Sequence, residues 1–153
     1  MEGRALTLEL LGTNELEIAY LAGLFDGEGC ISVHTTRHRF TISLHLFTDL
    51  KMTTPDPLRF ASRIFGGRVK PAFHRPNEQP MYRWSLYGSK SEAFLRAVDP
   101  YLIVKKEEAN LAFSFLACRS GNSPRKLELA ELITPHRTKN QPLNPNESTG
   151  NQR

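Results

Sequence analysis

Apolar and polar residues alternate along two long stretches of the chain, and this alternation predicts β-strands. Residues 31–47 alternate on both sides of a basic turn at 37–39, and residues 68–87 do so on both sides of the connector RPNEQP. Such alternation is typical of half-buried strands, so each stretch predicts a hairpin with one apolar and one polar face. The first strand of the second hairpin is expected over 68–74. Pro71 indicates an edge position or a bulge for this strand, because proline lacks a backbone donor.

Apolar residues recur at helical spacing in the segments around these hairpins. Capping and stop signals predict a helix capped by Asn14 that ends near Phe25 or Asp26, one between the Thr-Pro signals at 53–57 and Gly66–Gly67, one from Ser89 or Ser91 to about Asp99, one over 105–119, and one after Ser123. The order α-β-β-α-β-β-α, with further helices appended, predicts an α+β fold. In this fold a four-stranded antiparallel sheet carries the helices on its apolar face.

The other face of the sheet is expected to stay polar and open. Its predicted members are Ser32, His34, Thr36, Arg37, Thr41, Ser43, His45, Lys70, Ala72, His74, Arg83, Ser85 and Tyr87. Donors, acceptors and cations alternate there, as the reading of base edges in a wide groove requires, and Arg39, Arg68 and Arg75 lie nearby for phosphate contacts. An ordinary solvated sheet face would show the same alternation, so both interpretations stay open.

Positive charge is concentrated in the middle of the chain. The formal net charge of the 153 residues is only +4, but the stretch from Gly29 to Ser91 contains ten Lys and Arg residues against three acids. A contiguous basic stretch in a nearly neutral protein suggests a surface for a polyanion, most often nucleic acid. A solvated charged face is the alternative. The same charge argues against a simple protein-binding module.

The chain length suits one domain, expected over residues 1–137, and the polar segment 138–153 predicts a disordered tail. No apolar run approaches the ~20 residues of a membrane span, and the N-terminus lacks the pattern of a secretory signal. We therefore expect a protein without a membrane partner that is intracellular (cytoplasmic, nucleoid-associated or organellar) and not secreted. Cys30 and Cys118 lack metal-binding spacing, so structural zinc and a disulfide scaffold are not expected.

The residues LAGLFDGEG at 21–29 combine small residues with two carboxylates at the expected end of a helix. A helix C-terminus carries partial negative charge, so acids there are normally disfavoured. Ala19 and Gly23 lie four positions apart, as do Ala22 and Asp26, and such rows of small residues let a second helix approach closely. If the same helix of a second subunit packs there, two-fold symmetry brings the carboxylates of both subunits together at the axis.

Such a cluster of carboxylates would need a cation. Each further like charge would cost on the order of 1 kcal/mol, and hard divalent ions, chiefly Mg²⁺, prefer carboxylate and carbonyl oxygens. Paired metal ions are a standard means of cleaving a phosphodiester. Gly27 and Gly29 would let the backbone turn tightly and approach a phosphate. The alternative is a packed helix face that ends in a Gly turn with solvated acids.

LAGLFDGEG closely resembles the signature of the LAGLIDADG homing endonucleases. Tyr20 before it, the CISV strand after it, the segment PYLIVKKEEANL at 100–111 and the order of predicted elements also resemble that family, over roughly residues 14–133. The resemblance implies a site-specific DNA endonuclease that makes a double-strand break in a long, near-palindromic site by metal-dependent hydrolysis. The expected cofactor is Mg²⁺, for which Mn²⁺ can substitute, and the expected partner is double-stranded DNA.

The resemblance also implies roles for individual residues. Glu28 matches the acid that binds the metal, Gly27 would offer its carbonyl to the same ion, and Asp26 would support the helix end and the catalytic site. Lys105 matches the active-site lysine near the scissile phosphate, although lysines on charged helix faces are commonplace. Because the chain has one motif, a homodimer is implied. Its expected interface residues are Ala19, Ala22, Gly23 and Asp26.

One segment departs from the family pattern. Many members carry Gln or a similar polar residue after the second strand, whereas FTDLKMTTP at 47–55 contains no Gln. Asp49 and Lys51 are candidates for its place. A non-cleaving nucleic-acid binder on the same fold, either an intron RNA maturase or a DNA-binding regulator, is therefore kept as the alternative function.

Overall fold

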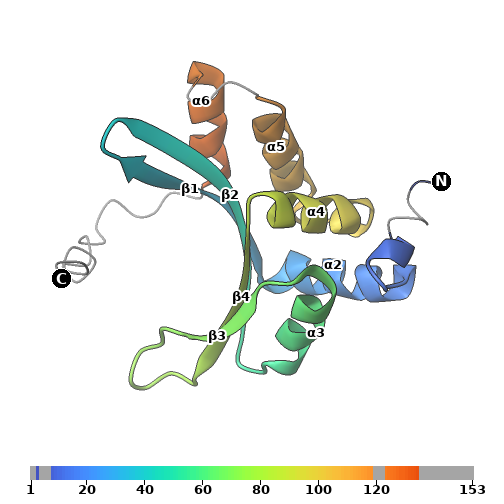
Figure 1. Ribbon diagram of the computed structural model, residues 1–153. Coiled ribbons are helices and arrows are strands. Elements are labelled where there is room, and N and C mark those ends of the chain that lie inside the picture. The colour runs from blue at the N-terminus through green and yellow to red at the C-terminus, as the bar shows by residue number, and fades with distance from the viewer. Residues whose placement is uncertain (1–2, 4–7, 119–122, 135–153) are drawn as a thin grey trace.

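The computed structural model describes residues 3, 8–118 and 123–134 and shows a four-stranded antiparallel sheet with helices packed on one side (Figure 1). In chain order the elements are α2 (Glu15–Glu28), β1 (Gly29–His38), β2 (Thr41–Met52), α3 (Asp56–Phe65), β3 (Arg68–Ala72), β4 (Met81–Tyr87), α4 (Ser89–Val98), the 3-10 helix η1 (Asp99–Tyr101), α5 (Lys106–Ala117) and α6 (Pro124–Ile133). The predicted α+β class and element order are confirmed. The predicted domain end at 137 and the tail at 138–153 lie outside the described residues.

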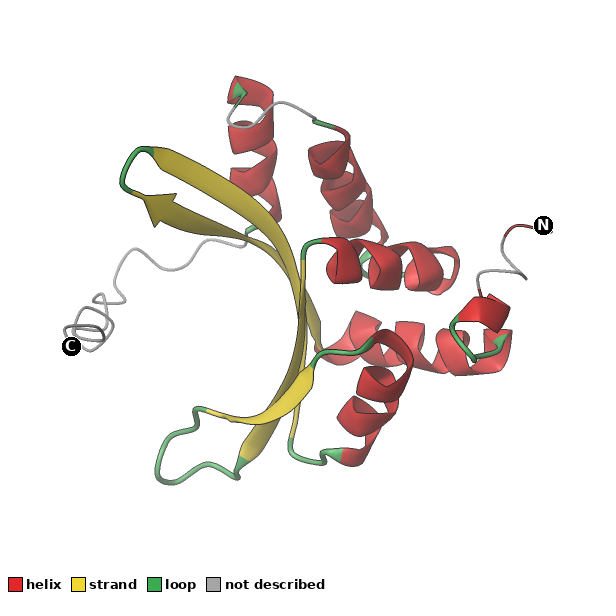
Figure 2. Cartoon of the chain, viewed as in Figure 1, coloured by secondary structure: helices red, strands yellow, loops and turns green. Residues whose placement is uncertain are grey.

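The sheet is curved, and its open side is concave. The strand order is β1-β2-β4-β3, so β1 and β3 are the edges, and Pro71 lies in an edge strand as predicted. Both hairpins bend away from the helices, which leaves the described helices on the convex side (Figure 2). The convex side carries the apolar residues of the alternating pattern, among them Ile31, Val33, Leu46, Leu50, Trp84 and Leu86, all buried.

Phe94 of α4 holds the centre of the core. Its ring contacts the rings of Phe25, Phe65 and Trp84 edge-on, with centroid distances of 5.0 to 5.2 Å. Edge-to-face contacts of this kind are favourable beyond the area they bury. They fix the C-terminal half of α2, through Phe25, against the sheet and α4.

Helix α2 begins at the predicted cap and ends later than predicted. The Asn14 side chain accepts a hydrogen bond from the Glu17 amide at 3.0 Å, and the Glu17 carboxylate accepts one from the Asn14 amide at 3.2 Å, which completes a capping box. The helix then runs through Gly27 to Glu28 instead of stopping near Asp26. Gly27 is helical and has no positive φ, so the predicted tight turn at this glycine is wrong.

Gly29 follows the helix and is required by packing. A Cβ atom at this position would overlap the ring of Phe25, which is fully buried. We therefore expect Gly29→Ala to lower the free energy of unfolding by about 1–3 kcal/mol, the usual cost of overpacking a core. Urea denaturation followed by circular dichroism measures this change. Gly27→Ala is the matched control, because nothing lies within 4 Å of a Cβ there, and it should not destabilise the protein.

Two strand boundaries differ from the sequence prediction. Strand β1 continues to His38, and its register pairs Arg37 with Ile42, so Arg37 belongs to the convex side and its placement on the open face is wrong. Strand β3 ends at Ala72, which leaves His74 in the connector before β4. The long β1–β2 ribbon explains the first difference, since its exposed end carries polar residues on both faces.

Candidate active site and nucleic-acid interface

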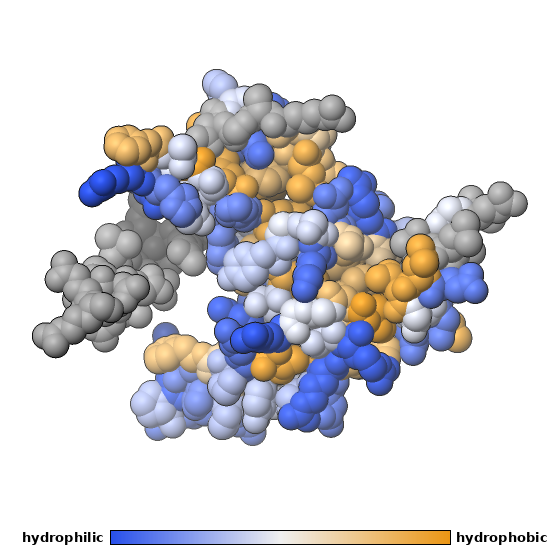
Figure 3. All heavy atoms as spheres, viewed as in Figure 1, coloured by the Kyte–Doolittle hydropathy of each residue, from blue (hydrophilic) through white to orange (hydrophobic). Residues whose placement is uncertain are grey.

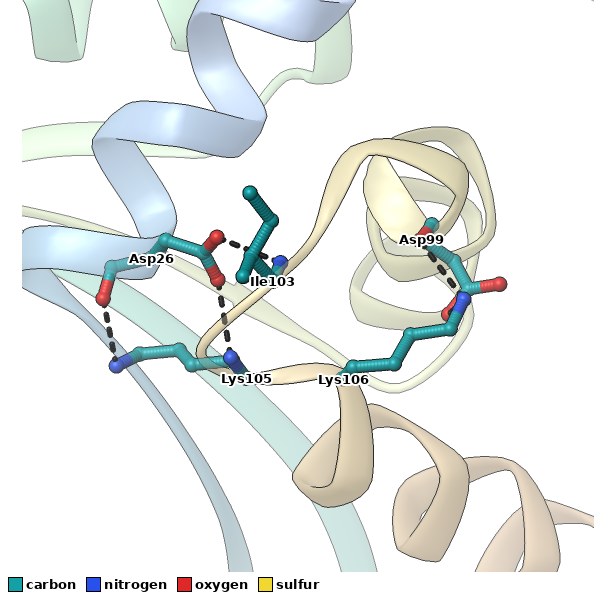
Figure 4. Close-up of polar contacts among 5 residues, drawn as sticks. All are labelled: Asp26, Asp99, Ile103, Lys105 and Lys106. Carbon is teal, nitrogen blue, oxygen red and sulfur yellow. Dashed lines mark hydrogen bonds and ion pairs between the residues drawn. The ribbon is translucent and has the colours of Figure 1, made fainter.

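The carboxylate of Asp26 joins the last turn of α2 to the segment before α5 (Figure 4). One carboxylate oxygen accepts a hydrogen bond from the Ile103 amide at 2.8 Å, and the other accepts one from the Lys105 amide at 3.0 Å. The Nζ of Lys105 in turn donates to the backbone carbonyl of Asp26 at 3.2 Å. The geometry therefore gives Asp26 a positioning role: it fixes the backbone that carries Lys105.

Lys105 supplies the cation that the end of α2 lacks in its own sequence. No basic residue lies in the last turn of the helix, although cations stabilise the unpaired carbonyls of a C-terminus. The ammonium group reaches such a carbonyl from a segment 79 residues further along the chain. This contact explains how acids are tolerated at the end of α2.

The ionisation of Asp26 follows from these contacts. Burial alone would raise the pKa of Asp26, but hydrogen bonds from the backbone amides of Lys105, Ile103 and Val104, together with the charge of Lys105, hold it below its ordinary value of 3.8. Because the pKa is lower in the folded state, the ionised carboxylate stabilises the fold above about pH 4. This contribution is lost as the pH falls through the folded-state pKa.

Asp26→Asn should therefore destabilise the protein in a pH-dependent way. We expect the free energy of unfolding to fall by about 1–2 kcal/mol at neutral pH, because one charge-assisted hydrogen bond is lost. The difference from the wild type should shrink below the ordinary carboxyl pKa, as denaturation series at several pH values would show. Asp56→Asn is the control, because Asp56 forms only an exposed pair with Arg59 and should have little effect. A difference that does not vary with pH would contradict the assignment.

Glu28 lies at the margin of the concave face. It is the last residue of α2 and is exposed, and within the described part of the chain its carboxylate has no hydrogen bond or ion pair. A cavity of about 290 Å³ on the concave face is lined by Glu28 together with Cys30, Ser32, His34, Phe47, Asp49, Lys51, Arg83 and Thr134. An unpaired carboxylate thus opens onto the same cavity as two cations.

The register aligns most of the predicted polar residues on the concave face. Ser32, His34, Thr36, Thr41, Ser43, His45, Lys70, Ala72, Arg83, Ser85 and Tyr87 share this face, and Arg68 joins them opposite Ser85. Arg39, His74 and Arg75 lie in the connections at the hairpin ends. These ends are mainly hydrophilic with isolated hydrophobic groups (Figure 3), and Phe40 and Phe73 there are each 93% exposed.

An aromatic cluster lies on the concave face; His34 and Tyr87 were predicted members of this face, whereas Phe47 was not. His34 stacks on Phe47 at a centroid distance of 4.1 Å, and Tyr87 contacts Phe47 at 4.6 Å, so the three rings bridge β1, β2 and β4. Phe47 occupies a polar position of the strand alternation, which is the signal that could have identified it. The face is therefore polar around an aromatic centre.

Two further groups lie beside these rings. Asp49, only 5% exposed, forms an ion pair with Arg83. Burial and the charges of Asp49 and Glu108 raise the pKa of the Cys30 thiol, which therefore stays protonated at neutral pH. Neither Cys30 nor Cys118 is fully buried.

Small and apolar residues follow one exposed stripe of α2. Leu16, Tyr20, Gly23 and Gly27 are all exposed, and Leu16 and Tyr20 line a groove of about 490 Å³ with Phe60 of α3. A Cβ at Gly23 or Gly27 would meet nothing within 4 Å. Ala19 is half-buried beside this stripe. Ala22 is fully buried in the core, so its predicted place in a subunit interface is wrong.

The described residues contain neither a ready-made metal cluster nor a membrane span. No group of three or more His, Cys, Asp or Glu side chains in this part of the chain could hold a metal ion. None of the helices described is both long enough and apolar enough to cross a bilayer.

The fold matches that of solved structures. No protein-family model matches the sequence, and no curated protein matches it. The homing endonuclease I-CvuI, solved with its DNA target in the presence of calcium, is 23% identical with a TM-score of 0.62 over 78% of this chain and 80% of that one. The archaeal intron-encoded homing endonuclease I-Vdi141I, solved with DNA, is 19% identical with a TM-score of 0.56 over 77% and 82%.

Two further homing endonuclease structures are also similar to this chain. The homing endonuclease I-TnaI is 18% identical with a TM-score of 0.53 over 76% of this chain and 97% of that one. The LAGLIDADG homing endonuclease I-SmaMI, solved with cleaved DNA, is 16% identical with a TM-score of 0.57 over 74% and 41%. The resemblance noted at the LAGLFDGEG motif is thus confirmed at the level of architecture, and the chain has the fold of the LAGLIDADG homing endonucleases.

Proposed function

We propose that the chain is a site-specific endonuclease that binds double-stranded DNA on its concave sheet and cuts both strands. The observation that carries this proposal is the cavity that Glu28 shares with Lys51 and Arg83. A free carboxylate suits a metal ion, and the cations beside it suit the phosphates of a nucleic acid. The solved homing endonucleases with the same fold, several of them bound to DNA, support this interpretation.

The residues at the end of α2 fit a hard divalent cation such as Mg²⁺, or Mn²⁺ in its place. Glu28 offers carboxylate oxygens without a partner among the described residues, and Gly27 lies in the last turn, where helix carbonyls lack helical partners. Carboxylate and carbonyl oxygens are the ligands that these ions prefer. When bound, the ion would activate a water molecule and stabilise the leaving oxygen of the phosphodiester.

In this proposal the chain's own residues position the substrate around that ion. Glu28 is the metal ligand and Lys105 is the catalytic cation, which offsets negative charge that develops at the scissile phosphate. Asp26 acts through Lys105, because its carboxylate fixes the backbone amide of that residue. Removing Asp26 should therefore affect catalysis indirectly, through the position of the ammonium group.

The proposed enzyme is a homodimer that joins along the exposed stripe of α2. One chain provides a single unpaired acid at the candidate metal site, because Asp49 is paired with Arg83, and a two-fold axis beside Gly23 would bring a second Glu28 close to the first. The absence of Cβ contacts at Gly23 and Gly27 leaves room for a second helix. Ala19 and Asp26 are retained in the proposed interface, and Leu16, Tyr20 and Phe60 extend it with apolar area.

Two symmetry-related sheets imply a long, near-palindromic DNA site. Each concave face would read one half-site through side chains of the central strands, while Arg39, Arg68, Lys70 and Arg75 at the margins would contact phosphates. We expect affinity for duplex DNA to fall about a thousandfold or more between 50 and 200 mM salt, since each phosphate contact releases counterions. Fluorescence anisotropy across a salt series measures this slope, and a salt-insensitive affinity would contradict the assigned surface.

The decisive test uses the DNA that flanks the reading frame of this chain. Its two halves, fused, form a candidate target, and the purified protein with Mg²⁺ should convert a plasmid carrying that target to a linear product. EDTA should prevent the reaction. Specific binding without any cleavage, with Mg²⁺ or Mn²⁺, would favour the alternative of a DNA-binding regulator. Selective binding of the intron transcript instead would favour a maturase.

A further inference from the structure

A buried carboxylate lies near the centre of the concave face. Asp49 of β2 is 5% exposed although its strand position faces the open side, where it pairs in register with Cys30 of β1 and Ser85 of β4. Its Oδ2 atom lies 3.0 Å from the Nε atom of Arg83. A buried carboxylate is costly unless it is paired, so the ion pair with Arg83 explains how the Asp49 carboxylate is tolerated at this buried position.

The pair holds one edge of the Arg83 head group and leaves the other edge for a ligand. The Nε atom is buried and has no aligned hydrogen bond, so Asp49 holds it by charge at close range. The Arg83 side chain as a whole is nevertheless 43% exposed. Since Arg83 contacts Asp49 through Nε, its two terminal nitrogens remain as parallel donors, with which a guanidinium binds two acceptors at once.

The neighbours of Arg83 make a base a better partner for it than a phosphate. Lys51 and Lys70 flank Arg83 in register on both sides, and within the described part of the chain neither lysine has an ion-pair partner. These two lysines are therefore available to contact phosphates. Arg83 has its charge largely balanced by Asp49 but retains its directional donors, and guanine offers two neutral acceptors, O6 and N7, in the major groove.

We propose that Asp49 positions Arg83 to read one guanine in each half-site. This inference rests on the proposed DNA-binding function and names a specificity-determining residue for it. Arg83 is the reading residue, and Asp49 acts through it without touching the DNA. Asp49 lies beside the candidate metal site but acts in base recognition and not in cleavage.

The test measures base preference by binding, separately from cleavage. The wild-type protein, Asp49→Asn, Arg83→Met and the double variant are each used with Ca²⁺ to select from a pool of randomised duplex DNA. We expect Arg83→Met to lose a guanine preference of about 5- to 150-fold at one position of each half-site, the usual discrimination of such a contact. Asp49→Asn should weaken the preference at the same position and should have no further effect in the double variant.

Control variants distinguish a loss of base preference from a general loss of affinity or stability. Lys70→Met should weaken binding to all sequences and reduce the salt slope without changing the preference. Because burial raises the pKa of Asp49 against the charges of Arg83, Lys51 and His34, the neutral Asn should leave the melting temperature no lower than in the wild type. Should Asp49→Asn fail to fold, Arg83→Lys replaces it, since this variant keeps the charge and removes the fork.

Three results would overturn the proposal. The first is an Asp49→Asn profile identical to that of the wild type, and the second is an equal effect of Asp49→Asn with and without Arg83. The third is a loss of cleavage at every site with an unchanged binding profile, which would assign Asp49 to the chemistry. A wild-type protein that selects no sequence from the pool would instead refute the proposed function itself.

Discussion

We expect Glu28→Gln to lose nearly all DNA cleavage and to keep DNA binding. The amide has nearly the size of the carboxylate but no charge, so the site loses its hard anionic ligand. A bound metal supplies several kcal/mol of stabilisation to the transition state, so the cleavage rate should fall on the order of 10³-fold or more. Affinity for the duplex without metal should be unchanged or higher, because a negative charge beside the phosphates has gone.

The measurement is single-turnover cleavage of the candidate target, paired with anisotropy on the same duplex. Glu107→Gln is the matched control, since Glu107 is an exposed acid in the first turn of α5 near Lys105 and should cut at the wild-type rate. Normal cleavage by Glu28→Gln would show that the acid is not a metal ligand. Equal loss of binding and cleavage would indicate instead that Glu28 supports the fold or the interface.

We expect Gly23→Leu to weaken the proposed dimer without destabilising the single chain. In one chain a Cβ at this exposed helical position meets nothing within 4 Å, and leucine is a better helix former than glycine by about 0.5–1 kcal/mol, so the monomer should become slightly more stable. In the proposed dimer the two added side chains meet near the axis. Overpacking of about 1–3 kcal/mol from each subunit would weaken association about 30- to 10⁴-fold.

Sedimentation velocity across a concentration series measures this shift, and cleavage should disappear with the dimer. Ser114→Leu provides the control, because it adds the same side chain at an exposed position of α5, away from the proposed interface. A Gly23→Leu protein that sediments like the wild type and still cuts both strands would refute the interface on α2.

The strands could be predicted because their pattern is local. Alternation of apolar and polar residues assigned β2 and β4 to the correct faces, since the side-chain period of a strand is two. The same logic failed at the end of β3, where His74 lies in the connector, and where the β1–β2 ribbon leaves the helices. There Arg37 has no core to face, so its polarity no longer shows its side of the sheet.

The orientation of α2 could not be predicted from its residues. Apolar and small residues surround this helix on most sides, so no stripe distinguishes the core from an interface. The two rows of small residues looked equivalent in sequence. Packing against Phe94 buries the side that contains Phe25, and Ala22 with it, and exposes the side that contains Gly23.

The contacts that organise the candidate site join distant segments. Asp26 meets the amides of Ile103 and Lys105, and Asp49 meets Arg83, across separations that periodicity and capping rules do not address. The family resemblance pointed to Asp26 and Lys105. The partners of the Asp26 and Asp49 carboxylates became known only from the three-dimensional structure.

The edges of the sheet limit how copies of this chain can associate. At one edge, Thr134 accepts a hydrogen bond from the Val33 amide at 3.3 Å and donates one to the Val33 carbonyl at 3.5 Å, so a side chain occupies the site where another strand would pair. At the other edge, Pro71 offers no N–H. Both edges are therefore poor templates for strand addition, which protects a protein that must be concentrated on DNA from aggregating through its sheet.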